Sequence, residues 1–380
     1  MKIVVWTGGA REAWGRDSWL VGGVGGSETA PSRVAHHLAL LGHEVVVRGR
    51  VIPSEESLGD LGGRVTYSPH DPSRPWRPEC DVFASSRELD ALANFAPRCR
   101  LKVFWAHDAS AGEDWRDLMS GYDVVFCLSG WARAAYMQQY PDVPAERFVL
   151  TRNGVEPSLF LREGEAAADP RPVAKRGCRC VYSSSPDRGL GRLLDLWPRV
   201  RRASPEAELC VYYGFDGWRA GAAGKPSVLR RIDYLEHRLR LMGSEGVRYC
   251  GRVGQSDLAR SLMEARFWLY PTHFAETSCI AAMEAQAAGA FPVATRLGAL
   301  PETVRWGRLL TWRDDPADYE DDFASAVEHS LSAGARTAES DMLEARRWAL
   351  ANLSWEGVAR QWHDLFASRL GVPPLKKGAS

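Results

Sequence analysis

The sequence predicts an α/β protein of two domains, each built around a parallel β-sheet in the manner of a Rossmann fold. Strand-like and helix-like segments alternate through the first half, and the alternation starts again near residue 180. A chain of 380 residues also exceeds what one hydrophobic core usually holds. With 45% hydrophobic and 25% charged residues, the composition is that of an ordinary globular protein.

The charge balance and the cysteines limit the classes of function. Lys and Arg equal Asp and Glu at 48 each, so no overall field favours nucleic acid or an anionic membrane. The opening MKIVVWTGG is a short strand rather than a signal peptide, and no apolar run approaches the length of a membrane span. The eight cysteines lack the spacing of a zinc or redox site. We expect a cytoplasmic protein with reduced thiols, for which peripheral membrane contact and the oligomeric state stay open.

The first half alternates strands with helices, of which those at 30–42 and 129–139 are the clearest. Strands are predicted at 3–6, 44–47, 64–67, 82–84, 101–105, 124–128 and 148–150. Ligands of such a sheet gather at the carboxyl ends of its strands.

A glycine-rich loop, Gly22-Gly23-Val24-Gly25-Gly26, follows the first strand. It does not make a dinucleotide-binding fingerprint, because Glu28 stands where the third glycine belongs and the second strand lacks an acid at its end. We expect the backbone at Gly25 and Gly26 to approach a phosphate or sugar closely. The alternative is a flexible loop that caps a helix.

His107 and Asp108 follow the strand at 101–105. A histidine at this end of a strand is placed to contact a substrate hydroxyl, although a structural role is the alternative. Asp108 is interpreted as the cap of the next helix.

The second half has strands at 180–182, 209–212, 247–250, 267–270 and 291–294, and an acid-rich loop at 314–322. The segment 162–177 lacks periodicity and is predicted to be a linker. The domains are therefore expected at 1–160 together with a final helix at 356–370, and at 161–355, with a disordered tail at 371–380.

The segment 270–302 carries the strongest functional signal. The strand stops at Pro271, and a helix is expected at 278–288. Glu276 lies at or just before its first turn and Glu284 inside it, with seven residues between them. Backbone amides at such a helix start attract phosphate, and the candidate amides are those of Thr277, Ser278, Cys279 and Ile280. Carboxylates beside this helix start are natural acceptors for hydrogen bonds from the hydroxyl groups of a ligand. A nucleotide sugar offers both a diphosphate and hydroxyls; the alternative is an ordinary strand-loop-helix unit with solvated acids.

These residues resemble a known family. Glu276, seven residues, Glu284 and Ala-Gly-x-x-Pro-Val at 288–293 resemble the donor-site signature of the retaining glycosyltransferases of family 4, glycosyl transferases group 1, which have the GT-B fold. Gly25-Gly26-Ser27-Glu28 resembles the family's Gly-Gly-x-Glu opening, and 151–157 its Asn-Gly-Val turn into the second domain. The resemblance covers nearly the whole chain; it is strongest at 251–302 and weakest at 50–100.

The resemblance implies two Rossmann-like domains that face a central cleft, with the last helix crossing back to the first domain. It implies a hexosyltransferase that moves a sugar, with retention, from a nucleotide-diphosphate sugar to a hydroxyl acceptor: a glycan, a glycolipid or a small-molecule natural product. UDP- or GDP-sugars are the expected donors. No Asp-x-Asp occurs in the sequence, so we expect neither a metal nor another cofactor.

The resemblance also implies roles for individual residues. His107, Glu276 and Arg188 would be catalytic. Arg188 would clamp the diphosphate, Glu276 would hold sugar hydroxyls, Glu284 the ribose, and Arg252 would lie near the base. Closure of the domains would bring His107 to the sugar. Ser183 stands where the family usually carries a cation, and Arg192 is either its substitute or a solvated helix residue.

The acceptor is not determined by the sequence. Loops at 8–24, 50–80 and 107–118 should shape its pocket, and they carry aromatic and basic residues: Arg11, Arg16, Trp14, Trp19 and Trp115. Aromatic rings suit sugars or an apolar aglycone, whereas arginines suit an anionic acceptor. Two alternative functions remain, a nucleotide-sugar epimerase on the same fold and a non-catalytic nucleotide-sugar-binding partner subunit.

Overall fold

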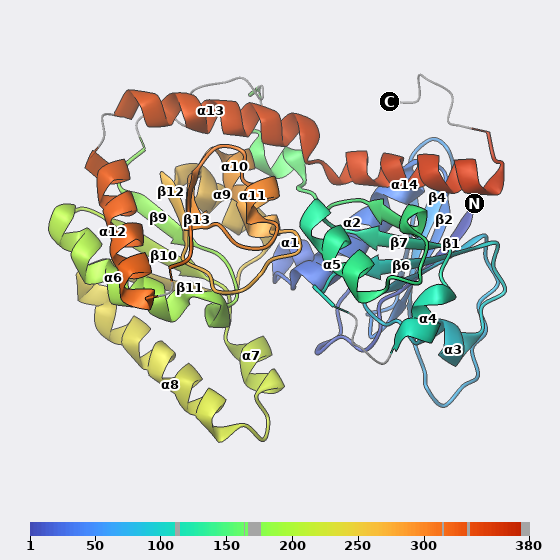
Figure 1. The fold of residues 1–380 in the computed structure, drawn as a ribbon. Coiled ribbons are helices and arrows are strands. Elements are labelled where there is room, and N and C mark those ends of the chain that lie inside the picture. The colour runs from blue at the N-terminus through green and yellow to red at the C-terminus, as the bar shows by residue number, and fades with distance from the viewer. Residues whose placement is uncertain (111–114, 163, 166–175, 314, 333–334, 374–380) are drawn as a thin grey trace. The chain divides into compact units, whose positions relative to one another are not determined.

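The computed structural model describes residues 1–110, 115–162, 164–165, 176–313, 315–332 and 335–373. It divides into two compact units (Figure 1). Unit 1 comprises Met1–Trp19, Val24–Gly154 and Ser354–Ser380, and unit 2 comprises Leu20–Gly23 and Val155–Leu353. Most of the predicted linker, at 163 and 166–175, and residues 374–380 of the predicted tail lie outside the described ranges.

Unit 1 is built on an eight-stranded sheet of order β3-β4-β2-β1-β5-β6-β7-β8. Neighbouring strands are parallel except β3, which is antiparallel to β4. The strands are β1 (Lys2–Trp6), β2 (Glu44–Gly49), β3 (Ser54–Leu58), β4 (Gly63–Pro69), β5 (Val82–Ser86), β6 (Leu101–Ala106), β7 (Val124–Cys127) and β8 (Phe148–Leu150). The edge strand β3 was not predicted. Its sequence Ser-Glu-Glu-Ser-Leu has no apolar face, and it is ordered by pairing with β4.

The helices of unit 1 are α2 (Gly26–Leu40), α3 (Ala91–Phe95), α4 (Arg116–Ser120), α5 (Gly130–Gln139) and α14 (Trp355–Leu370). A short 3₁₀ turn spans Ala145–Arg147, and the four-residue α1 (Ser18–Val21) contributes residues to both units. Helix α2 begins earlier than predicted, because the amides of Glu28 and Thr29 both donate to the carbonyl of Gly25.

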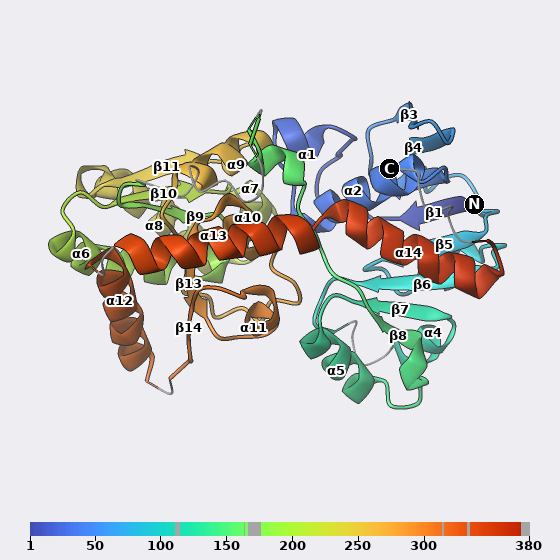
Figure 2. The same ribbon diagram turned by 90° about the horizontal axis from the view of Figure 1, so that it is seen from above.

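The last helix, α14, packs on α2 and completes the core of unit 1 (Figure 2). The Trp362 ring lies 4.5 Å from Trp105 and 4.4 Å from Phe126, centroid to centroid, and its Nε1 donates to Thr151 Oγ1 at 3.0 Å. His363 Nδ1 lies 2.8 Å from His43 Nε2. The final helix thus belongs to the same unit as the first strand, as the fold prediction required.

Unit 2 is built on a six-stranded parallel sheet of order β11-β10-β9-β12-β13-β14. Its strands are β9 (Arg179–Tyr182), β10 (Glu208–Tyr212), β11 (Val247–Gly251), β12 (Phe267–Tyr270), β13 (Phe291–Thr295) and β14 (Arg308–Leu310). The prediction of an α/β protein with two Rossmann-like parallel sheets is therefore confirmed, β3 excepted.

The helices of unit 2 are α6 (Leu190–Ala203), α7 (Asp216–Gly221), α8 (Pro226–Leu241), α9 (Gln255–Glu264), α10 (Ile280–Ala288), α11 (Leu300–Thr303), α12 (Pro316–Ser332) and α13 (Ala335–Asn352). In the described part of unit 2, 3₁₀ turns lie at Pro157–Phe160, Pro186–Arg188 and Met242–Glu245. Helix α10 packs against α9 and α13, and α6 packs against α12 (Figure 2). In the described ranges, none of the helices combines the length and apolarity needed to cross a membrane.

The prediction of an acid-rich loop at 314–322 is wrong. From Pro316 onward this run forms the start of α12. Its acids are held by arginines that are remote in sequence: Glu320 pairs with Arg192 and Asp321 with Arg199. These ion pairs attach the first turns of α12 to α6.

Arg176 joins the ends of two helices in unit 2. Its guanidinium donates to the carbonyls of Ala265 at 2.5 Å, Gly289 at 3.0 Å and Ala288 at 2.7 Å, which lie just past α9 and at the end of α10. Burial, with the nearby Arg346 charge, lowers the pKa of Arg176 to about 9. Its positive charge stabilises carbonyl groups that the helices leave without internal partners.

Replacing Arg176 by methionine is expected to lower the free energy of unfolding of unit 2 by about 2–3 kcal/mol, because three carbonyls lose a charged donor. Urea denaturation followed by tryptophan fluorescence measures the change. Arg202→Met, at an exposed position near the end of α6, is the matched control. Equal stability of the two variants would contradict the proposed role of Arg176.

Candidate functional site

The loop between β12 and α10 is held by the turn that follows β13. Thr295 Oγ1 donates to the carbonyl of Thr272 at 2.7 Å, and the amide of Ala299 donates to the carbonyl of Glu276 at 2.7 Å. Gly298 has φ +58°, and a Cβ at this position would lie 2.5 Å from the Glu276 carbonyl oxygen. Only glycine lets the two loops approach so closely, and this approach fixes the backbone of Glu276.

The Glu276 carboxylate is the centre of a buried polar cluster. It is 5% exposed, and its two oxygens lie 3.0 and 3.2 Å from Arg188 Nη1. The hydroxyl of Tyr270 donates to Glu276 Oε1 at 2.5 Å and accepts from Ser184 Oγ at 3.1 Å. Burial, reinforced by the Glu276 charge, raises the pKa of Tyr270 well above its ordinary value, so the phenol remains a donor.

Arg188 ends the 3₁₀ turn after β9, the strand next to β12. The chain turns at Gly189, with φ +122°, where a Cβ would lie 2.5 Å from the carbonyl oxygen of Pro271. The guanidinium carbon lies 3.9 Å above the centre of the Phe274 ring. Although burial opposes it, the Glu276 carboxylate raises the pKa of Arg188 above its ordinary value. The Arg188 side chain is 34% exposed, so it is only partly covered.

The structure accounts for Ser183 and Arg192 in different ways. Ser183 is buried, and its Oγ accepts from Trp268 Nε1 at 3.1 Å. The interpretation of Arg192 as a solvated helix residue is wrong. It is ion-paired with Glu320 at 3.2 Å and lies 4.6 Å above the Trp312 ring. Arg192 Nη1 also donates to the Pro271 carbonyl at 3.3 Å, so it supports the loop that carries Glu276.

Helix α10 begins at Ile280, two residues later than expected, with Cys279 at its N-cap. Thr277, Ser278 and Cys279 are buried in the loop before it. Glu284 lies inside the helix and is 6% exposed. Burial raises the pKa of Glu284 to about 8, so the group is largely protonated at neutral pH. The alternative that both acids are solvated does not hold.

The buried Glu284 predicts a pH dependence of stability. Between the ordinary value of 4.5 and about 8, the folded chain binds a proton here that the unfolded chain has lost. The free energy of unfolding therefore falls as the pH rises through this window, by up to about 1.4 kcal/mol per pH unit, and levels off above it. Thermal melts from pH 5 to 9 should show a smaller fall for Glu284→Gln than for the natural chain. Parallel profiles would exclude this group as the cause.

Arg252 follows β11 and contacts Gly23 within unit 2. Its Nη2 donates to the Gly23 carbonyl at 2.5 Å. A Cβ at Gly254 would lie 2.0 Å from the carbonyl oxygen of Leu20, so this turn fits closely against that segment. In unit 1, Gly25 is the N-cap of α2 and Gly26 its first residue.

Unit 1 has a cavity of about 270 Å³ at the carboxyl ends of β1, β5 and β6. Its lining includes Thr7, Trp14 and Ser27, and the charged residues Glu28, Arg87, Glu88 and Asp108. His107 stands next to Asp108, with its ring 4.4 Å from that of Trp105. Burial, with Arg87 as a second cause, lowers the pKa of His107 to about 3, so the imidazole is neutral.

Sequence reasoning missed Arg87 and Glu88. Arg87 has φ +72° and pairs with Asp108 through Nε at 2.8 Å and Nη2 at 3.1 Å, so Asp108 is an ion-pair partner. Glu88 accepts from Trp6 Nε1 at 2.7 Å and from the amide of Gly9 at 3.1 Å. The available signal was their place, immediately after the strand at 82–84.

The predicted site residues thus lie in two groups. Arg188, Arg252, Glu276, Glu284 and residues 277–280 belong to unit 2, where Arg188 and Glu276 are in direct contact. Gly25, Gly26 and His107 belong to unit 1. The described residues contain no cluster of three or more His, Cys, Asp or Glu side chains arranged to hold a metal ion.

Comparison with known proteins identifies what the chain resembles. Residues 179–333 match the family model described as glycosyl transferases group 1. The chain is 23% identical over 262 residues to alpha-maltose-1-phosphate synthase of Mycolicibacterium smegmatis, covering 66% of this chain and 64% of that protein. It is 36% identical over 138 residues to D-inositol 3-phosphate glycosyltransferase of Nocardioides sp., covering 35% of this chain and 29% of that protein. The chain thus spans less than two thirds of the length of these relatives.

Solved structures extend the similarity to the whole fold. Anabaena Alr3699/HepE in complex with UDP and glucose superposes with a TM-score of 0.68 at 14% identity, covering 97% of this chain and all of that one. Sucrose-phosphate synthase of Thermosynechococcus elongatus superposes with a TM-score of 0.65 at 18% identity, covering 98% of this chain and 99% of that one. The chain has the GT-B fold of these proteins, and the predicted class of enzyme, a transferase, agrees with the family match.

Proposed function

We propose that this chain is a retaining glycosyltransferase of family 4 that transfers a sugar from a nucleotide-diphosphate sugar to a hydroxyl acceptor without a metal ion. The observation that carries the proposal is the Arg188–Glu276–Tyr270 cluster beside the start of α10. It combines a partly exposed arginine with a fixed carboxylate at the carboxyl ends of adjacent parallel strands, where such sheets bind ligands. The complexes of HepE with UDP-glucose and with UDP support UDP-glucose as the first donor to test.

In this proposal unit 2 binds the donor. The bond that breaks joins the anomeric carbon to the diphosphate, so negative charge grows on the departing diphosphate oxygen. Arg188 and the amides at the start of α10 stabilise that charge because they are already oriented toward an anion. Glu276 accepts hydrogen bonds from sugar hydroxyls, Glu284 bonds the ribose and Arg252 lies near the base.

The acceptor oxygen forms the new bond on the face that the diphosphate leaves, and its proton passes to the departing diphosphate. This route retains the configuration without a covalent enzyme intermediate. Arg188 supplies positive charge at the diphosphate, and the sequence has no Asp-x-Asp motif, which supports metal independence. Gly25, Gly26 and His107 of unit 1 are proposed to complete substrate binding.

A thermal-shift panel tests the donor site. It covers UDP, GDP, ADP, CMP and dTDP with their common sugars, with magnesium or EDTA. A ligand at about 100 times its Kd stabilises the folded chain by about 2.7 kcal/mol, and we expect this shift for one nucleotide class, unchanged by EDTA. No shift with any nucleotide, from a folded sample, would contradict the proposal. Product analysis by NMR then distinguishes a transferase from an epimerase, which would release an altered nucleotide sugar without acceptor.

A further inference from the structure

The charges that line the unit 1 cavity are predominantly negative. Glu28, Glu88 and Asp108 bring three carboxylates to its wall, and Arg87 brings one guanidinium. The start of α2 also borders the cavity and its dipole favours anions, but Glu28 already places an acid in this first turn. The cavity therefore has more negative than positive charge on its wall.

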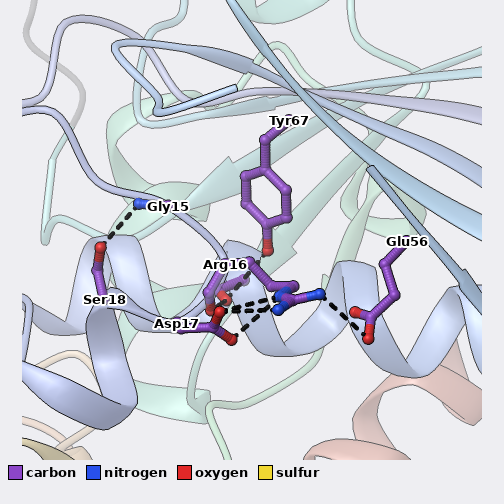
Figure 3. A network of polar contacts seen from close by, with 7 residues as sticks. Gly15, Arg16, Asp17, Ser18, Glu56 and Tyr67 are labelled. Atoms are coloured by element: carbon purple, nitrogen blue, oxygen red, sulfur yellow. Dashed lines mark hydrogen bonds and ion pairs between the residues drawn. The ribbon is translucent and has the colours of Figure 1, made fainter. Parts of the chain in front are cut away.

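Two arginines at this end of unit 1, Arg87 and Arg16, are paired with acids. Arg87 binds Asp108 through two nitrogens at 2.8 and 3.1 Å. Figure 3 shows the same for Arg16, which the sequence made a candidate for binding an anionic acceptor. Its guanidinium binds Asp17 at 2.9 Å and lies 3.3 Å from Glu56. An incoming anion would have to compete with these carboxylates.

The remaining lining suits hydroxyl groups. Thr7, Ser27 and Ser86 contribute hydroxyl-bearing residues, and Trp14 also lies at the lining. Ionised carboxylates only accept hydrogen bonds, so they pair with O–H donors and repel a phosphate, which is anionic at neutral pH. The volume of about 270 Å³ lies just below the range of about 300–1,000 Å³ typical of ligand pockets, which suits one sugar-sized ring.

We propose that this cavity binds the acceptor and selects a neutral polyhydroxylated ring, a sugar or cyclic polyol, over its phosphate monoester. The inference rests on the proposed glycosyltransferase function and specifies its acceptor class. It separates this chain from two relatives whose names contain phosphorylated compounds, maltose 1-phosphate and inositol 3-phosphate. The Arg87–Asp108 pair is the specificity determinant, because it keeps the guanidinium from binding an anion.

Transfer assays with matched acceptor pools test the proposal. The full-length chain is incubated with labelled UDP-glucose, or with the donor that the thermal panel selects. One pool holds neutral compounds, including glucose and myo-inositol, and the other holds their phosphate monoesters, including glucose 1-phosphate and inositol 3-phosphate. We expect products from the neutral pool at rates at least tenfold higher. Preference for the phosphate pool overturns the inference, and so does donor hydrolysis without product from either pool.

Asp108→Asn tests the ion pair itself, since it releases Arg87 without changing the shape of the side chain. We expect the preference for neutral acceptors to fall at least tenfold, and Glu28→Gln to lower it in the same direction. Glu79→Gln is the matched control, because Glu79 pairs with Arg98 at 2.8 Å elsewhere in unit 1 and should leave the preference unchanged. An unchanged preference in both cavity variants, with the donor-induced thermal shift intact, overturns the role of these charges. A chain that neither binds nor turns over any donor contradicts the proposed function instead.

Discussion

Replacing Glu276 by glutamine is expected to lower kcat/KM about a hundredfold or more. The carboxylate fixes Arg188 through contacts at 3.0 and 3.2 Å and accepts from Tyr270. Glutamine keeps the size of the side chain but loses the charge, so the guanidinium is no longer held at one position. A displacement of about 1 Å in a group that contacts the reacting atoms is enough for a hundredfold loss.

The measurement is initial-rate kinetics with the selected donor, together with a thermal melt to establish that the variant is folded. Glu264→Gln is the control, because Glu264 forms an exposed ion pair with Arg179 in the same unit. Its rate should match that of the natural chain. Full turnover in folded Glu276→Gln would refute the assignment of this residue to the site.

Replacing Gly298 by alanine is expected to lower the free energy of unfolding of unit 2 by about 3 kcal/mol. An alanine held near φ +58° costs about 1–2 kcal/mol by itself. The added methyl also lies 2.5 Å from the carbonyl oxygen and 2.7 Å from the nitrogen of Glu276. Because both are backbone atoms, the loop must move, and donor binding should weaken with it.

Gly224→Ala separates the two causes. Gly224 has φ +75° in the same unit, but no atom lies within 4 Å of the position of its Cβ. This control should lose only the conformational part, about 1–2 kcal/mol, and should keep donor binding. Urea denaturation and the donor-induced thermal shift measure both effects. Equal losses in the two variants would show that contact with the Glu276 backbone is unimportant.

Much of the fold was predictable because the strands of both sheets are short apolar runs separated by helices. Segments whose order comes from distant partners were not predictable. Strand β3 has no apolar pattern and is formed by pairing with β4. The acids at the start of α12 resemble a solvated loop until the arginines of α6 are known to face them.

The candidate site was predicted in its members but not in its geometry. Arg188 was identified from the resemblance to the family, and Glu276 from its spacing to Glu284 together with that resemblance. The contact between them joins residues far apart in the chain. It follows from the adjacency of β9 and β12, which the sequence does not specify. Arg87 was missed because a positive φ at a non-glycine residue leaves no signature in the sequence.

The position of α14 has a consequence for the order of events during translation. Trp362 fills the space beside Trp105 and Phe126, so unit 1 cannot close its core until α14 has left the ribosome. The intervening stretch of roughly 200 residues takes on the order of 10–40 s to synthesise at about 5–20 residues per second. Throughout that interval the nascent sheet exposes the aromatic surface that α14 later covers, whereas Val155–Leu353 is already complete when α14 appears. The domain that begins first is thus the last to be finished.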